Sequence, residues 1–261
     1  MAWVYDMDIR MLSSPNFTAG RHGWKPDMMV AHTSGNTTQS AINTAMNPAN
    51  TVSYHDIIAG ANFDGRGIVP AYRDGDIIQL VDIRNSAHHA GTSAEVRARS
   101  TLAAVRQRTN ASPNWYSYGF AFGDMNLNGG RLTEAQIKSA VRIIQHRRAE
   151  IKRIYGVDIP LDRNHIVGHN QINTVTRAFC PGNIQWDEIM DGLNIKYESR
   201  ANEMSETRYN KVSEMPGWAQ ADIQELIDRG LLRGSDGDAS RLNLSLDMIR
   251  MLIIENRREA H

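Results

Sequence analysis

Short apolar runs bounded by turn-forming residues mark the strands expected in the first two-thirds of the chain. Residues 28–32 (MMVAH) follow a Pro-Asp pair, and a run of this length is too short for a helix. It predicts a buried strand that ends at His32. The polar residues 33–40 (TSGNTTQS) that follow it predict a loop.

Further strands are expected where β-branched and aromatic residues gather between turn formers, at residues 51–59 (TVSYHDIIA), 76–83 (DIIQLVDI) and 116–122 (YSYGFAF). The second of these follows Arg-Asp-Gly, as the partner strand of a hairpin would. Gly119 in the third marks a place where a backbone or a ligand comes close. Residues 164–168 (NHIVG) resemble a brief strand that presents His169, and residues 171–182 should be loop.

One long helix is the clearest element of the sequence. Thr133 and Gln136 form a capping box, and Gly156 ends the helical run. Apolar residues repeat between them at helical spacing: Ile137, Ala140, Val141, Ile144, Ile151 and Ile154. Because strands and helices are mixed, the main domain should be α/β, with a central mixed sheet flanked by helices.

The last quarter of the chain predicts a small helical module. A polar, charged stretch marks a linker, which gives a main domain at 1–196, a linker at 197–208 and a C-terminal module at 209–261. Two helical stripes follow the linker: Trp218, Ala219, Ile223, Leu226 and Ile227, then Leu246, Ile249, Leu252 and Ile253. Two short helices bury little surface, so the module should lean on the main domain or on a partner.

Composition and charge narrow the class of partner. The 261 residues are 41% hydrophobic and 22% charged, as in an ordinary globular protein, and 29 basic residues balance 29 acidic ones. This balance argues against nucleic acid as the main partner. The N-terminal segment lacks the features of a signal peptide, and no stretch is apolar enough for membrane insertion. We therefore expect a cytoplasmic location until something releases the protein.

Two histidines and the one cysteine are the candidate metal ligands. His32 and His169 each end a short apolar run, where a strand holds an imidazole with little freedom. Cys180 has no cysteine partner for an intramolecular disulfide, and it follows His169 by a loop that can fold back. Three His and Cys ligands with a fourth position left to water are typical of catalytic zinc. By spacing alone, buried core histidines and a free cysteine remain an equal alternative.

Five segments, in order, resemble the type-2 N-acetylmuramoyl-L-alanine amidases, the fold shared by phage lysozyme-amidases and peptidoglycan recognition proteins. They are MMVAHTSG, VSYHDII, GDIIQLVDIRNSAHHAG, YSYGFAF and IVGHNQINTVTRAFCPG. The resemblance covers about residues 26 to 190. It implies hydrolysis of the amide between N-acetylmuramic acid and L-alanine in peptidoglycan, with Zn²⁺ as the cofactor and lysis of the bacterial cell wall as the result.

The resemblance also assigns roles by position. His32, His169 and Cys180 match the zinc ligands, Tyr54 matches a tyrosine that contacts the attacking water or the tetrahedral intermediate, and His89 matches a histidine lining the cleft. Two departures concern positions where relatives often carry functional residues, which here are Ala178 and Ala121. Arg177 can replace the first missing group if its guanidinium reaches the oxyanion.

The C-terminal segment resembles the small modules of phage-encoded wall hydrolases, which implies wall targeting or homo-oligomerisation. A phage or prophage endolysin released by a holin-type partner is the expected setting.

Two other functions stay open. Cys180 could be the nucleophile of a cysteine peptidase with His169 or His89 as its base, or the chain could bind peptidoglycan without cleaving it.

Overall fold

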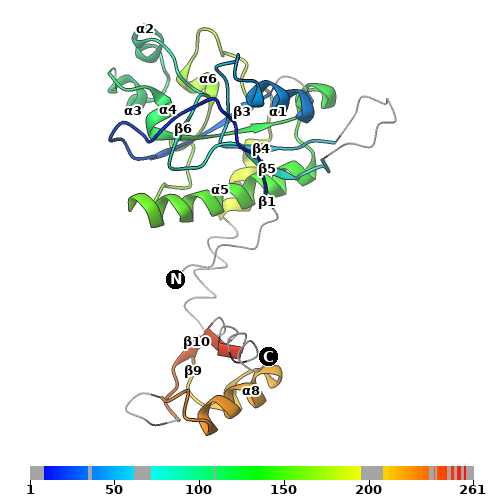
Figure 1. Cartoon of the computed structure of the whole chain (residues 1–261), viewed down its shortest axis with the longest axis vertical. Helices are drawn as coiled ribbons and strands as arrows, with labels where there is room; N and C mark the ends of the chain where they lie inside the picture. The colour runs from blue at the N-terminus through cyan, green and yellow to red at the C-terminus, as the bar shows by residue number, and fades with distance from the viewer. Residues whose placement is uncertain are drawn as a thin grey trace. The chain divides into compact units, whose positions relative to one another are not determined.

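The structure is a computed structural model that describes residues 9–34, 37–61, 72–108, 110–194, 208–234, 238, 240–245, 248–249, 252–253 and 256. Two compact units make up the chain, Met1–Asn194 and Ile195–His261 (Figure 1). Each is described by itself. The predicted linker, apart from its last residue, lies outside the described residues.

A six-stranded mixed sheet forms the centre of the first unit (Figure 1). Its strands are β1 (Ile9–Met11), β3 (Met28–Thr33), β4 (Asp56–Ile58), β5 (Ile77–Gln79), β7 (Ser117–Phe122) and β8 (Ile166–Gly168). They lie in the order β1-β5-β4-β7-β3-β8. Strands β4, β7, β3 and β8 are parallel, whereas β5 pairs antiparallel with β4 and parallel with β1. A separate antiparallel ladder joins β2 (Phe17–Thr18) to β6 (Ser86–Ala87). The predicted α/β class with a mixed central sheet is confirmed.

Helices cover both faces of this sheet. They are α1 (Thr38–Met46), α2 (Ala94–Ala98), α3 (Ala103–Arg106), α4 (Pro113–Tyr116), η1 (Met125–Asn128), α5 (Glu134–Tyr155), α6 (His169–Ile172) and a helix at residues 186–194. The predicted long helix is confirmed as α5, with both hydrogen bonds of the capping box at Thr133 and with Gly156 in the left-handed conformation that ends it.

The alternation of side chains along β3 decides which face carries the site. Met29 and Ala31 point into the core shared with α5, while Met28 and Val30 belong to a cluster on the opposite face. His32 follows the parity of Met28 and Val30. His32 therefore lies near the carboxyl end of β3, on the face away from α5.

Several local predictions were wrong in detail. Residues 33–40 were expected to be loop, but α1 begins at Thr38, since the Thr37 side chain caps it and Ala41, Ile42 and Ala45 bury one face. Part of the loop expected at 171–182 belongs to α6. The strand expected at 51–59 is only Asp56–Ile58, because the preceding backbone bonds instead to the carbonyls of His88 and Gly119.

The second unit contains the first of the two predicted helices, α8 (Gly217–Asp228), and its described residues 248–249, 252–253 and 256 are also helical. It further contains η2 (Val212–Glu214) and an antiparallel ladder of β9 (Arg208–Tyr209) with β10 (Leu244–Ser245), which helical periodicity did not predict. Ile223 and Leu226 of α8 pack with Leu244 and Ile253 in a core of this unit's own.

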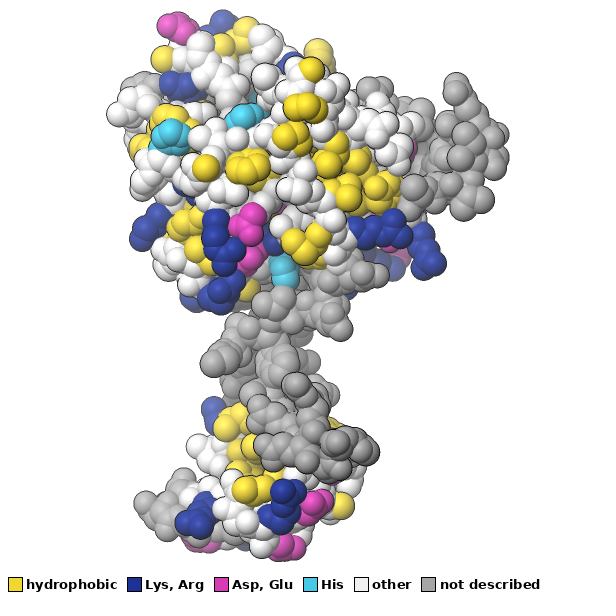
Figure 2. Space-filling model, in the orientation of Figure 1, with side chains coloured by type: hydrophobic (Ala, Val, Ile, Leu, Met, Phe, Trp, Pro, Cys, Tyr) yellow, Lys and Arg dark blue, Asp and Glu magenta, His cyan; other side chains and the backbone are white. Residues whose placement is uncertain are grey.

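Two surface properties bear on the class of partner. Among the described residues, no helix is both long and apolar enough to cross a membrane. On the face shown in Figure 2, Lys and Arg side chains lie in several small groups separated by uncharged surface. The mixed charges on that face agree with the balanced charge of the chain.

Candidate metal centre and active site

Three segments distant in sequence bring the predicted metal ligands together. His32 lies near the carboxyl end of β3, His169 is the first residue of α6, and Cys180 lies in the loop beyond. Because β3 and β8 pair in parallel, with Ala31 opposite Gly168, both strands deliver a histidine to the same edge of the sheet. The candidate ligand atoms of these three residues all lie within 4.8 Å of one another. Such a cluster has the dimensions of a site for one ion.

Direct contacts define the cluster further. The Cys180 Sγ atom lies 3.8 Å from His32 Nδ1, and the rings of His32 and His169 have centroids 4.6 Å apart. The Asn170 amide donates to the Cys180 carbonyl at 2.7 Å, which ties the loop back to α6. Nε2 of His169 is buried and has no hydrogen-bond partner within the described part of the chain. Buried polar atoms are nearly always paired, so an unpaired imidazole nitrogen in this cluster is an observation that a bound metal ion would explain.

Burial keeps both imidazoles in the form that binds metals. It lowers the pKa of His32 well below its ordinary value, and it lowers the pKa of His169 to about 4, with a smaller effect from the Arg177 charge. Both rings are therefore neutral at pH 7, with a lone pair available. Burial raises the pKa of the Cys180 thiol, so this group needs a cation beside it to ionise near neutral pH.

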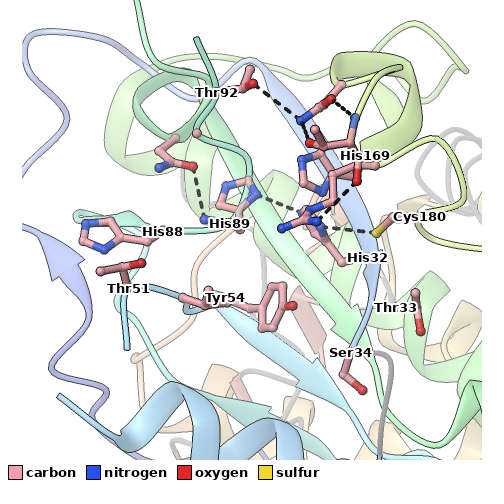
Figure 3. Close-up of a pocket in the computed structure, with 16 residues that line it drawn as sticks. His32, Thr33, Ser34, Thr51, Tyr54, His88, His89, Thr92, His169 and Cys180 are labelled. Carbon is pink, nitrogen blue, oxygen red and sulfur yellow. Dashed lines mark hydrogen bonds between the residues drawn. The ribbon is translucent and has the colours of Figure 1, made fainter. Parts of the chain in front are cut away.

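Tyr54 lies beside the cluster, on the chain segment that leads into β4. Its ring centroid is 5.3 Å from that of His32, and both side chains line the same cleft (Figure 3). Burial raises the pKa of Tyr54 to about 12. The phenol therefore stays protonated at neutral pH and is able to donate a hydrogen bond into the cleft.

Arg177 lines the cleft from the exposed loop that precedes Cys180. Its neighbour Ala178 is also exposed, so the place expected for a lysine or threonine of relatives offers no polar group. Ala121 lies opposite His32 in the β3–β7 pairing and is fully buried in an apolar cluster. The position expected for a glutamate of relatives therefore contributes no carboxylate.

His89 contacts a candidate ligand directly. Its Nδ1 atom lies 3.0 Å from His32 Nε2, so His32 stands between His89 and Cys180 (Figure 3). His89 also lines the cleft, although only 7% of its surface is exposed. The sequence predicted a close approach at Gly119, and a Cβ atom there would lie 2.4 Å from the His89 ring.

The cleft around the cluster has a volume of about 730 Å³, within the range of small-molecule sites. Its lining is mostly polar: His32, Thr33, Ser34, Thr51, Val52, Tyr54, His88, His89, Gly91, Thr92, Asn114, His169, Asn173, Thr176, Arg177 and Cys180. None of these described residues is Asp or Glu. A bound substrate would meet hydroxyl, amide and imidazole groups.

Sequence reasoning missed several of these residues. His88 and Thr92 reach the cleft from loops, and Asn114 reaches it from the short helix α4. The positions of these segments depend on tertiary contacts, and no local pattern marked them. Ser117, which bonds to His89, was read only as part of a strand. A polar residue at the start of an otherwise apolar strand was the one signal that pointed to it.

The fold and the cluster define an α/β protein with a candidate metal centre in an open cleft. Its sequence matches the model of the N-acetylmuramoyl-L-alanine amidase family over residues 22–183, and the chain belongs to this family. A search of curated proteins found no match.

This chain is also similar to solved structures of low sequence identity. PlyL is 16% identical, with 72% of this chain and 97% of that chain covered and a TM-score of 0.45. A selenomethionine derivative of AmpD is 20% identical, with 73% and 96% covered and a TM-score of 0.46. AmpDh3 from Pseudomonas aeruginosa, in complex with an anhydromuramic pentapeptide, is 19% identical, with 74% and 66% covered and a TM-score of 0.44.

Proposed function

We propose that this chain is a zinc-dependent amidase that hydrolyses the bond between N-acetylmuramic acid and the L-alanine of the peptidoglycan stem peptide. The observation that carries the proposal is the convergence of His32, His169 and Cys180 within 4.8 Å in an open cleft. The family match, which spans all three residues, supports the same reaction.

The residues present fit a zinc ion. Two neutral imidazoles and a thiol are the donor types that zinc prefers, and three protein ligands leave a fourth position for water. The unpaired Nε2 of His169 is an independent observation that supports a cation at this site. When bound, zinc would lower the pKa of a water ligand to about 7 and polarise the carbonyl of the substrate.

Tyr54 and Arg177 would act on the substrate carbonyl. The Tyr54 hydroxyl stays protonated at neutral pH, because its pKa is about 12, so it can donate to the oxygen that becomes negative as the amide is attacked. Arg177 brings a permanent positive charge to the same cleft. Both groups would stabilise the transition state more than the ground state, since the charge develops only there.

Proton transfer to the leaving amine would fall to groups other than a carboxylate. The described lining of the cleft has no Asp or Glu, and Ala121 is buried among apolar side chains. His89 is at the cleft surface, but its Nδ1 faces His32. The Tyr54 hydroxyl, which stays protonated beside the cluster, is the candidate for this transfer.

The cysteine peptidase alternative fits the site less well. A nucleophilic cysteine needs a lowered pKa, whereas burial raises that of Cys180. The two mechanisms also differ in their response to reagents, because a thiol enzyme tolerates a chelator and a zinc enzyme does not. A peptidoglycan-binding protein without activity would bind the wall and release no product.

The test combines metal analysis with an assay for newly released L-alanine amino termini from purified peptidoglycan. We expect about one zinc per chain, activity lost on chelation and restored by zinc, and loss of zinc in His169→Ala and Cys180→Ala. Arg177→Ala should keep zinc and lose activity. Zinc without cleavage would favour the binding protein, and cleavage that resists chelators but stops on thiol alkylation would transfer the chemistry to Cys180.

We also propose that the protein accumulates in the cytoplasm and reaches the wall through a holin-type partner. The proposal is supported by the substrate class alone, because peptidoglycan lies outside the cytoplasmic membrane. Expression in a bacterial host should leave culture turbidity unchanged until a pore-forming agent is added, and turbidity should then fall. Lysis without that agent would contradict the need for a partner.

A further inference from the structure

A chain of hydrogen bonds runs from the backbone into the candidate metal centre. The Ser117 Oγ atom lies 2.6 Å from the Pro113 carbonyl oxygen and 3.3 Å from His89 Nε2. Nδ1 of His89 lies 3.0 Å from His32 Nε2, and Nδ1 of His32 faces the Cys180 sulfur at 3.8 Å. Ser117 is fully buried, and only 7% of the His89 surface is exposed.

The hydrogen bond to the Pro113 carbonyl fixes which atoms donate in this series. A carbonyl oxygen only accepts, so the Ser117 hydroxyl hydrogen points at Pro113. The Ser117 oxygen is then an acceptor toward His89, whose Nε2 must carry the ring proton. A neutral imidazole has one N–H, which leaves His89 Nδ1 as an acceptor toward His32.

We propose that His89 and Ser117 are positioning residues that hold the ring proton of His32 on Nε2 and so aim its Nδ1 lone pair at the metal. This proposal rests on the zinc site proposed above. In that arrangement His32 donates to His89, His89 donates to Ser117, and the metal-facing nitrogen needs no tautomer change before it binds. Partners of this kind tune the affinity of metal sites.

Contacts with neighbouring residues fix the position of His89. The backbone amides of His89 and Ala90 both donate to the Asn114 side chain, at 3.1 and 2.7 Å. Gly119 leaves the space that the His89 ring fills, since a Cβ atom there would come within 2.4 Å. These contacts fix both the backbone and the ring, as a positioning role requires.

The test compares two nearly isosteric substitutions, His89→Leu and His89→Asn, in the full chain. Asn keeps an acceptor at the place of Nδ1, and Leu does not. Zinc affinity, measured by competition with a chelator, should fall about 10- to 100-fold in His89→Leu. His89→Asn should regain most of that loss. His165→Leu, at a histidine whose ring bonds to Asp162 and does not line the cleft, should keep the affinity of the unmodified protein.

A second readout reports the protons directly. Imidazole ¹⁵N NMR spectra of the metal-free protein should show both His32 and His89 protonated on Nε2, and Ser117→Ala should mix the His89 tautomers. Thermal unfolding of each metal-free variant controls for loss of fold.

The outcomes separate this inference from the function on which it rests. An unmodified chain that binds no zinc would remove the metal site and the inference together. Zinc binding that is equally tight in His89→Leu, or equally weak in His89→Asn and His89→Leu, would overturn the positioning role alone. His32 protonated on Nδ1 in the metal-free protein would overturn it as well.

Discussion

Burial gives Tyr54 and the candidate ligands opposite protonation behaviour within one cleft. It raises the pKa of Tyr54 to about 12 and lowers that of His169 to about 4, so the phenol keeps its proton and the imidazole loses one at neutral pH. One environment therefore provides a hydrogen-bond donor for substrate beside a lone pair for metal. Removal of the Tyr54 hydroxyl should therefore affect catalysis without affecting metal binding.

Substitution Tyr54→Phe should lower kcat by about 10²- to 10³-fold, the loss typical of one oxyanion donor, while zinc content stays the same. Steady-state kinetics on a soluble muropeptide, with metal analysis of the same sample, measures both quantities. Tyr155→Phe is the matched control, since its hydroxyl bonds to the Ile83 carbonyl and does not line the cleft. Equal kcat in the two variants would exclude the donor role of Tyr54.

At the scale of elements, a buried ion pair joins α5 to β4 behind the site. Arg147 of α5 donates to both carboxylate oxygens of Asp56, at 2.9 and 2.8 Å, and the Tyr118 hydroxyl donates to the same carboxylate at 2.8 Å. Asp56 is fully buried and Arg147 is 4% exposed. Asp56 follows Tyr54 by two residues, so this pair anchors the segment that carries the phenol.

Breaking this buried ion pair should lower the free energy of unfolding much more than breaking an exposed pair. Asp56→Asn should lower the free energy of unfolding by about 3–5 kcal/mol, because the Arg147 charge stays buried with a weaker partner. Urea unfolding followed by circular dichroism measures the change. Glu134→Gln breaks the exposed Glu134–Lys138 pair on the same helix and should leave the unfolding midpoint unchanged. Similar midpoints in both variants would show that Asp56 is not an anchor.

The sequence predicted elements whose own residues determine them. Helix α5 has a complete capping box and a long apolar stripe, and β3 is one apolar run, so local patterns were enough. Helices α2, α3 and α4 have four or five residues each, too few to be stable alone, and their positions depend on tertiary packing. Helix α1 was hidden because its first turn is polar.

The same distinction applies to the site. His32 and His169 were identified from their places at strand ends, and Cys180 was identified as the lone cysteine on a loop after His169. Tyr54 and His89 were matched through the family resemblance. The link between His89 and Ser117 could not be predicted, since it exists only when β7 lies beside the loop that carries His89. Their roles, like those of Tyr54 and Arg177, stay predictions until the variants are measured.

At the scale of the whole molecule, the candidate active site belongs to the first of the two compact units. The cleft and its cluster lie entirely within Met1–Asn194, and Ile195–His261 has its own core around α8. Trp218 of α8 is 52% exposed, which is unusual for a large aromatic side chain in a small unit. We propose that the second unit binds the cell wall, with self-association as the alternative that the sequence also allows.

A truncated chain that ends at Asn194 should therefore keep its amidase activity and bind insoluble peptidoglycan less tightly. Its kcat/KM on a soluble muropeptide should stay within about twofold of the full chain, because all the lining residues of the cleft remain. Sedimentation with insoluble peptidoglycan should fall, and Trp218→Ala in the full chain should reproduce part of that loss. Light scattering of the full chain distinguishes the alternatives, because it reports the oligomeric state. A monomeric full chain that sediments with peptidoglycan only when residues 195–261 are present would support wall binding. A dimer that dissociates on truncation, with unchanged affinity for peptidoglycan, would instead assign the second unit to assembly.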